Sequence, residues 1–297
     1  VGRDPLGAGR GVSGMTLWEA LVGLGLGLAL GGLGYRGRLL APSGALAVVG
    51  LAVVVFAAGG WEWGVVLAVH LIGAALWTRY RATAKEILSQ RHERPGPLGW
   101  EQVVARTGWP ALLALLRGSG SASIVVLGAY VGAVAAATAD RWSTEVGLLS
   151  AQPPRLITTR RTAVPGAPGA VSPLGLVAAL GGTWLVGLTA LGAEVLSAWL
   201  AVLPYARGLL WLPLAAMVAG LGASLVDSLL AATAQAVYYC PTCDRSTEDP
   251  AHCCDEEAEP VERVRGVPWL TDELVDLIGS LVGAAVAALL IGALAGL

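Results

Sequence analysis

The residues best suited to chemistry lie in residues 139–172, between two long apolar segments. This stretch holds two carboxylates, several arginines and hydroxyl side chains, and a turn rich in glycine and proline. Asp140 directly follows an apolar run, so we expect it at or just inside a membrane boundary, where an ionisable group is costly and is a functional candidate. Guanidinium groups match phosphate oxygens, and glycines let backbone N–H groups approach them. The stretch predicts a phosphate-handling site at a membrane surface.

The groups expected to bind phosphate or nucleotide are cationic, hydroxyl or glycine residues of this stretch: Arg155, Thr158, Thr159, Arg160, Gly166, Gly169 and Ser172. Lys85, the only lysine in the chain, is a further candidate from the preceding basic loop. It can serve a phosphate as a point charge. A solvated basic loop at a membrane surface explains Lys85 equally well.

Three acidic residues are candidates for catalysis, namely Asp140, Glu145 and Asp227. Mg²⁺ takes one or two carboxylates and completes its shell with water and phosphate oxygens, so such a set suits a Mg²⁺–nucleotide site. Asp140 and Glu145 are five residues apart, which on a continuous helix turns them about 140° from each other. They share a metal only if the helix breaks between them. Otherwise Glu145 pairs with Arg141 and is structural.

The four cysteines of the chain gather in a second motif, YYCPTCDRSTEDPAHCCDEE. A CxxC pair followed by histidine and cysteine suits tetrahedral Zn²⁺. We expect a structural zinc site, because four protein ligands leave no open position, and the expected ligands are Cys240, Cys243, His252 and Cys254. Thiols without a metal are the alternative.

Composition identifies the class of protein. The chain is 55% hydrophobic and only 13% charged, against about 25% charge in soluble domains. Several windows reach the roughly 20 apolar residues that span a bilayer, and their glycine and alanine content favours close helix packing. We predict an all-α, polytopic helical membrane protein with about eight spans, in a range of seven to nine, at residues 16–34, 43–60, 62–78, 102–117, 122–139, 173–193, 208–238 and 274–296.

The expected organisation follows from these spans. We expect residues 1–15 to form a dispensable leader, residues 16–239 a transmembrane bundle with loops 79–101 and 140–172, residues 240–272 a Cys/His loop, and residues 273–297 the last span. All but four of the 19 lysines and arginines fall on one side, which the positive-inside rule assigns to the cytoplasm. The net charge of −2 predicts no nucleic-acid partner.

A series of motifs in this chain resembles the integral membrane family typed as domain of unknown function 92, which includes phytyl-phosphate kinases and the animal transmembrane protein nineteen. The motifs are ADRWSTEVG at residues 139–147, PPRLITT at 153–159, PGAPGAVS at 165–172, DSLLAATAQ at 227–235 and RGVPWL at 265–270. The family pattern has hydroxyls where this chain has Arg141 and Ala167, and an asparagine near Arg106. The carboxylates, Arg155 and the turn glycines are retained.

This resemblance implies an enzyme of the cell membrane that phosphorylates an isoprenoid monophosphate with a nucleoside triphosphate, CTP among the candidates. The expected partners are therefore the lipid bilayer, the isoprenoid monophosphate and the nucleotide, with Mg²⁺ as catalytic cofactor and Zn²⁺ as structural metal. Intramembrane carboxylates are also typical of transporters, so a transporter or lipid-handling protein without nucleotide turnover is the alternative. A scaffold that recruits a partner through the zinc knuckle is a third.

Overall fold

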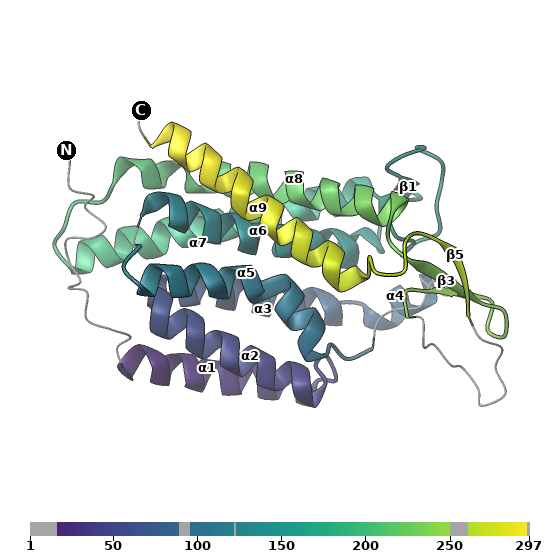
Figure 1. Ribbon diagram of the computed structural model, residues 1–297, viewed down its shortest axis with the longest axis horizontal. Coiled ribbons are helices and arrows are strands. Elements are labelled where there is room, and N and C mark those ends of the chain that lie inside the picture. Colours follow the sequence, from purple (N-terminus) through teal and green to yellow (C-terminus); the bar gives the residue numbers. More distant parts are fainter. Residues whose placement is uncertain (1–16, 89–95, 122, 250–260, 296–297) are drawn as a thin grey trace.

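The computed structural model describes residues 17–88, 96–121, 123–249 and 261–295. Most of these residues form long helices aligned with one axis (Figure 1). The helices are α1 (Leu17–Arg36), α2 (Pro42–Val54) with a π-helical turn (Val55–Gly59), α3 (Trp61–Arg79), the short α4 (Ala82–Leu88), α5 (Trp100–Gly118), α6 (Ile124–Gly147), α7 (Pro173–Leu200), a 3₁₀ turn (Arg207–Trp211), α8 (Leu212–Thr233) and α9 (Asp272–Leu294).

The all-α membrane architecture is confirmed. Within the described part of the chain, seven helices are long and apolar enough to cross a membrane, and they correspond to seven of the eight predicted spans. The remaining prediction, residues 102–117, corresponds to α5. This helix runs alongside the others (Figure 1), but it buries Arg106 and contains Pro110. The number of apolar spans therefore lies at the lower end of the expected range.

Helix α6 forms the centre of the bundle, packed against α3, α5, α7, α8 and α9. Its residues from Leu127 to Ala139 are all buried and are mostly alanine, glycine and valine. A Cβ on Gly132 would collide with the carbonyl oxygen of Gly283 in α9. Close approach through small residues is how membrane helices gain packing energy, so this composition explains how one helix contacts five others.

Helix α1 packs mainly on α2, through a stripe of glycines. Gly23, Gly27, Gly31 and Gly34 are its buried residues. A Cβ on Gly27 would lie 2.9 Å from the Cα of Val49, and one on Gly31 would lie 2.8 Å from the carbonyl oxygen of Ala45. The glycine face of α1 thus packs against α2, and the leucines of α1 lie on its other faces.

The short strands lie at one end of the bundle, together with α4 (Figure 1). The strands β1 (Arg155–Leu156) and β2 (Ala170–Val171) form one antiparallel pair. The strands β3 (Val237–Cys240), β4 (Arg245–Thr247) and β5 (Glu262–Arg265) form an antiparallel sheet of order β4-β3-β5. The predicted loops therefore share one end, which we call the strand end. The loop expected from residue 140 begins later, because α6 continues to Gly147.

A separate polar cluster lies at the end of the bundle opposite the strands. Arg117 is 3.6 Å from Glu194 and lies over the ring of Trp63. The hydroxyl of Ser197 donates to Glu62 at 2.5 Å. These contacts join α3, α5 and α7, so charged residues fasten this end of the bundle.

Candidate functional site

A cavity of about 970 Å³ opens at the strand end. Its lining residues come from all the long helices and the short α4, and from the turn before α7. Six of the predicted site residues line it: Asp140, Glu145, Gly166, Gly169, Ser172 and Asp227. The structure therefore brings these segments of the chain together at one cavity.

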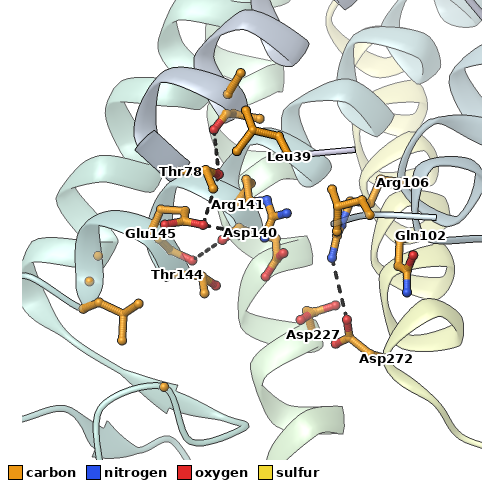
Figure 2. A pocket seen from close by; sticks show the side chains of 18 of the residues that line it. Leu39, Thr78, Gln102, Arg106, Asp140, Arg141, Thr144, Glu145, Asp227 and Asp272 are labelled. Carbon is orange, nitrogen blue, oxygen red and sulfur yellow. Dashed lines mark hydrogen bonds and ion pairs between the residues drawn. The ribbon is translucent and has the colours of Figure 1, made fainter. Parts of the chain in front are cut away.

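Asp140 of α6 and Asp227 of α8 both line this cavity. Figure 2 shows both side chains, together with Asp272 of α9, turned toward the same space. Gly279 of α9 makes room for this arrangement, since a Cβ there would lie 3.2 Å from an oxygen of Asp227. Three helices thus place carboxylates at one point of the cavity.

Arg106 of α5 is the cation that faces these acids. Its Nε lies 2.8 Å from Asp276 and one terminal nitrogen lies 3.6 Å from Asp272. The residue is 9% exposed, and its Nη1 has no hydrogen-bond partner among the described residues. A buried guanidinium nitrogen without a partner is costly. Because Arg106 lines the cavity, its positive charge is suited to an anionic ligand there.

Glu145 lies on the side of α6 away from Asp140, in a buried network. Lys85 donates to its carboxylate at 2.8 Å and to the carbonyl oxygen of Trp77. Thr78 donates to the same carboxylate at 3.1 Å, and Arg141 lies 3.9 Å away. The break in α6 that a shared metal would require is absent, so the structural alternative for Glu145 fits the geometry. Lys85 is fully buried and is not presented to a phosphate.

The Gly/Pro-rich turn is held against the end of α8. Gly169 has a φ of +77°, and a Cβ on it would lie 2.6 Å from the backbone of Ala232. Arg265 of β5 donates to the carbonyl oxygens of Ala231, Ala232 and Pro168. It thereby satisfies carbonyl groups that the end of a helix leaves without partners.

Ser172 begins α7. Its hydroxyl accepts from the N–H of Gly175 at 3.1 Å and donates to the carbonyl oxygen of Gly147 at 3.3 Å. Ser172 therefore caps the N-terminus of α7 and holds it against the end of α6. The same contacts hold the turn with Gly166 at the cavity wall.

The remaining predicted phosphate-binding residues lie apart from this cavity. Arg155, Thr158, Thr159 and Arg160 are exposed, and none of them lines it. Arg155 instead donates to the carbonyl oxygen of Arg160 at 3.3 Å. The cavity takes its cations from Arg38, Arg79, Arg106 and Arg141.

Sequence reasoning missed the contribution of α9 and did not include Arg106 of α5 among the site residues. Asp272 and Asp276 are four residues apart at the start of an apolar span, a spacing that places both on one helix face. That signal was present in the sequence. Arg106 and Arg141 stood out only as replacements of polar residues, yet the structure places both at the cavity.

His70 of α3 lines the cavity where its polar part meets its apolar part. Its Nδ1 lies 2.9 Å from the hydroxyl oxygen of Thr138. That hydroxyl donates its own hydrogen to the carbonyl oxygen of Val134, so the hydrogen between His70 and Thr138 belongs to Nδ1. Nδ1 is thus the donor in this contact.

The carboxylates fit Mg²⁺ by donor type. Within the described part of the chain, no group of three or more histidine, cysteine, aspartate or glutamate side chains has the geometry of a metal site. Mg²⁺ needs only one or two carboxylates, because substrate phosphates and water supply the other ligands. Asp140 and Asp227 would be the holding residues, and the positive charge of Arg106, which lines the same cavity, would favour the phosphates.

The cysteine motif is described in part. Cys240 ends β3 and is buried, and Cys243 lies in the turn before β4. The sheet positions both ends of a CxxC turn. His252 and Cys254 lie outside the described residues. Nearby, the hydrogen bond to Asp244 raises the pKa of Tyr239.

The long apolar helices and the charged cavity at one end define a polytopic helical membrane protein with a polar site at a membrane boundary. The chain belongs to the integral membrane protein family DUF92, whose pattern matches residues 25–284. It is 30% identical to Protein PGR of Arabidopsis thaliana over 83% of this chain and 87% of that protein. An uncharacterized membrane protein of Methanocaldococcus jannaschii is 44% identical over 20% of this chain and 25% of that protein. No solved structure matches.

Proposed function

We propose that this protein is a membrane kinase that transfers a phosphoryl group from a nucleoside triphosphate to an isoprenoid monophosphate, at the cytoplasmic face of the membrane. CTP is one candidate donor. The observation that carries this proposal is that Asp140, Asp227 and Arg106 line one cavity, which also has apolar walls from membrane-spanning helices. Acids and a cation suit a metal-bound phosphate, and the apolar walls suit a hydrocarbon.

The proposed reaction forms one bond and breaks one. A phosphate oxygen of the isoprenoid monophosphate attacks the γ-phosphorus, the bond from that phosphorus to the β-phosphate oxygen breaks, and the nucleoside diphosphate leaves with the electron pair. Mg²⁺, when bound, neutralises phosphate charge. Arg106 and Arg141 contribute fixed positive charge near the transferred group, and the bundle around the carboxylates limits access of water.

The cytoplasmic orientation is part of the proposal. The strand end carries most of the basic residues, which is typical of a cytoplasmic surface. Family membership and the resemblance of the motifs to those of phytyl-phosphate kinases support the reaction class. The name of the Arabidopsis relative specifies no reaction.

The experiment uses the full chain, purified in detergent, with Mg²⁺, one of several nucleoside triphosphates, and phytyl or geranylgeranyl monophosphate. Mass spectrometry should detect the isoprenoid diphosphate. We expect Asp140→Asn and Asp227→Asn each to lower the rate on the order of 10²-fold or more, the usual cost of losing a charged group that organises the transition state. Glu262→Gln, at an exposed position of β5 away from the cavity, is the matched control.

Absence of product with every nucleotide and chain length would contradict the proposal. The transport alternative gives the opposite pattern. Protein reconstituted into vesicles would then move an isoprenoid phosphate across the membrane without consuming nucleotide.

A further inference from the structure

The cavity has an apolar arm that leads away from the carboxylates. Its lining residues come from the first three helices and are Leu30 and Leu33 of α1, Val48 of α2, and Leu71, Ile72 and Ala75 of α3. From Thr78, at the polar part, to Leu71 the arm follows α3 for about 10 Å, at 1.5 Å per residue. The arm therefore extends into the apolar part of the bundle.

The arm has a lateral mouth. Leu33 is 65% exposed and Ile72 is 44% exposed, although both line the cavity. They belong to helices of membrane-spanning length and composition, so their exposed surfaces face lipid. Because α1 uses its glycine face on α2, its leucines are left to border this mouth.

The charged and apolar parts of the cavity suit a ligand that is itself anionic at one end and apolar at the other. At one end the cations Arg106 and Arg141 line the cavity. At the other end Leu30, Leu33, Val48, Leu71, Ile72 and Ala75 offer hydrocarbon walls. A volume of about 970 Å³ is within the range of pockets that hold one small molecule. A single-chain amphiphile with an anionic head meets all three conditions.

We propose that the apolar arm binds the hydrocarbon tail of a single-chain lipid monophosphate, which reaches the site sideways from the bilayer between α1 and α3, with its phosphate toward Arg106. The proposal rests on the proposed function for the identity of the head group. It adds the place of the tail, the route of access and the residues that set which tail fits.

The first test maps the tail directly. A geranylgeranyl monophosphate analogue with a photoreactive diazirine at the far end of its tail is bound to the full-length protein without nucleotide. After illumination, labelled peptides are identified by mass spectrometry. We expect labels in residues 30–33 of α1 and 71–75 of α3, and we expect excess phytyl monophosphate to prevent them while inorganic phosphate does not. Labels confined to α7 and α8, or spread evenly over lipid-facing helices, would overturn the proposal.

The second test changes the mouth of the arm. Ile72→Trp should weaken binding of geranylgeranyl monophosphate on the order of tenfold or more, the usual scale of a steric change in an apolar pocket. Binding of a five-carbon isopentenyl monophosphate should change little. The matched control is Leu28→Trp, at a lipid-exposed position of α1 that does not line the cavity. Equal effects of the two variants, or equal loss for both ligands, would contradict the assignment.

These tests are separable from the kinase reaction, because neither uses nucleotide. Labelling of the arm in a protein that makes no diphosphate would sustain the tail site and reject the kinase. Diphosphate formation with labels elsewhere would sustain the kinase and reject the tail site. Competition by a diacyl phosphatidic acid as strong as that by phytyl monophosphate would reject the single-chain assignment.

Discussion

Lys85 places its ammonium nitrogen 2.8 Å from the carboxylate of Glu145, and the two side chains are 0% and 3% exposed. Every other residue of α4 is exposed. This ion pair therefore inserts one side chain of a surface helix into the bundle and fixes α4 over the cavity.

We predict that Lys85→Met lowers stability by about 3–5 kcal/mol, since it leaves Glu145 as a buried charge with weakened compensation. The double variant Lys85→Met/Glu145→Gln should recover much of this loss, because the second change removes the uncompensated charge. Thermal unfolding in detergent measures both. A stable Lys85→Met protein that has lost phosphate binding would instead assign the lysine to the ligand.

Arg106 should show two separable roles, the first in stability and the second in diphosphate formation. Arg106→Met leaves Asp276 buried without its cation and should lower stability by about 3–5 kcal/mol. Asp276→Leu added to it should restore stability, because an apolar pair replaces the ion pair. Diphosphate formation should remain low in both variants, since each lacks the guanidinium at the cavity. Arg155→Met, at an exposed position outside the cavity, should keep stability and activity. Recovery of activity in the double variant would contradict the second role.

Gly169→Ala tests the turn before α7. The positive φ and the backbone of Ala232 both oppose a side chain there, so we expect a cost of about 1–3 kcal/mol and weaker nucleotide binding. Gly222→Ala is the control, because its added methyl group meets no neighbour within 4 Å and alanine favours a helix. Thermal unfolding and nucleotide titration distinguish the two variants, and equal behaviour would show that the turn carries no constraint.

The zinc prediction is tested by metal analysis of protein purified without added chelator. We expect stoichiometric zinc, and its loss in Cys240→Ser and His252→Ala. Ser246→Ala on β4, which changes no expected ligand, should retain the metal. Protein without zinc would remove the assignment, and activity that survives chelation would show that the metal is structural.

The sequence was sufficient for the helical bundle because long apolar runs have few other folded forms in a membrane. The ends of the helices were less certain. Residues 140–147 contain Asp140, Arg141 and Glu145, which looks like the start of a polar loop. The structure continues α6 through them, since Lys85, Arg141 and Thr78 satisfy Glu145 inside the bundle. Composition alone does not reveal such tertiary partners.

Asp140, Asp227 and the turn glycines Gly166 and Gly169 were chosen from the sequence as candidate site residues, and all four line the cavity. The predicted cations Lys85, Arg155 and Arg160 do not line it. The choice of Arg155 and Arg160 relied on proximity in sequence to Asp140. Residues 155–156 pair with residues 170–171 as β1 and β2. In this arrangement the side chains of Arg155 and Arg160 remain exposed. Arg106 comes from a helix remote in sequence, and only the packing of α5 brings it to the acids.

The glycine stripe of α1 determines which positions of that helix tolerate substitution. At Gly27 and Gly31 a larger residue would force α1 away from α2, so mutations on that face would be eliminated by loss of folding. On the opposite face any apolar residue of suitable size preserves the contact with lipid. Leu33, which is 65% exposed, can thus change by ordinary mutation without disturbing the bundle. In the proposed tail site, evolution can adjust the preferred tail at this position while the charged part of the cavity stays the same.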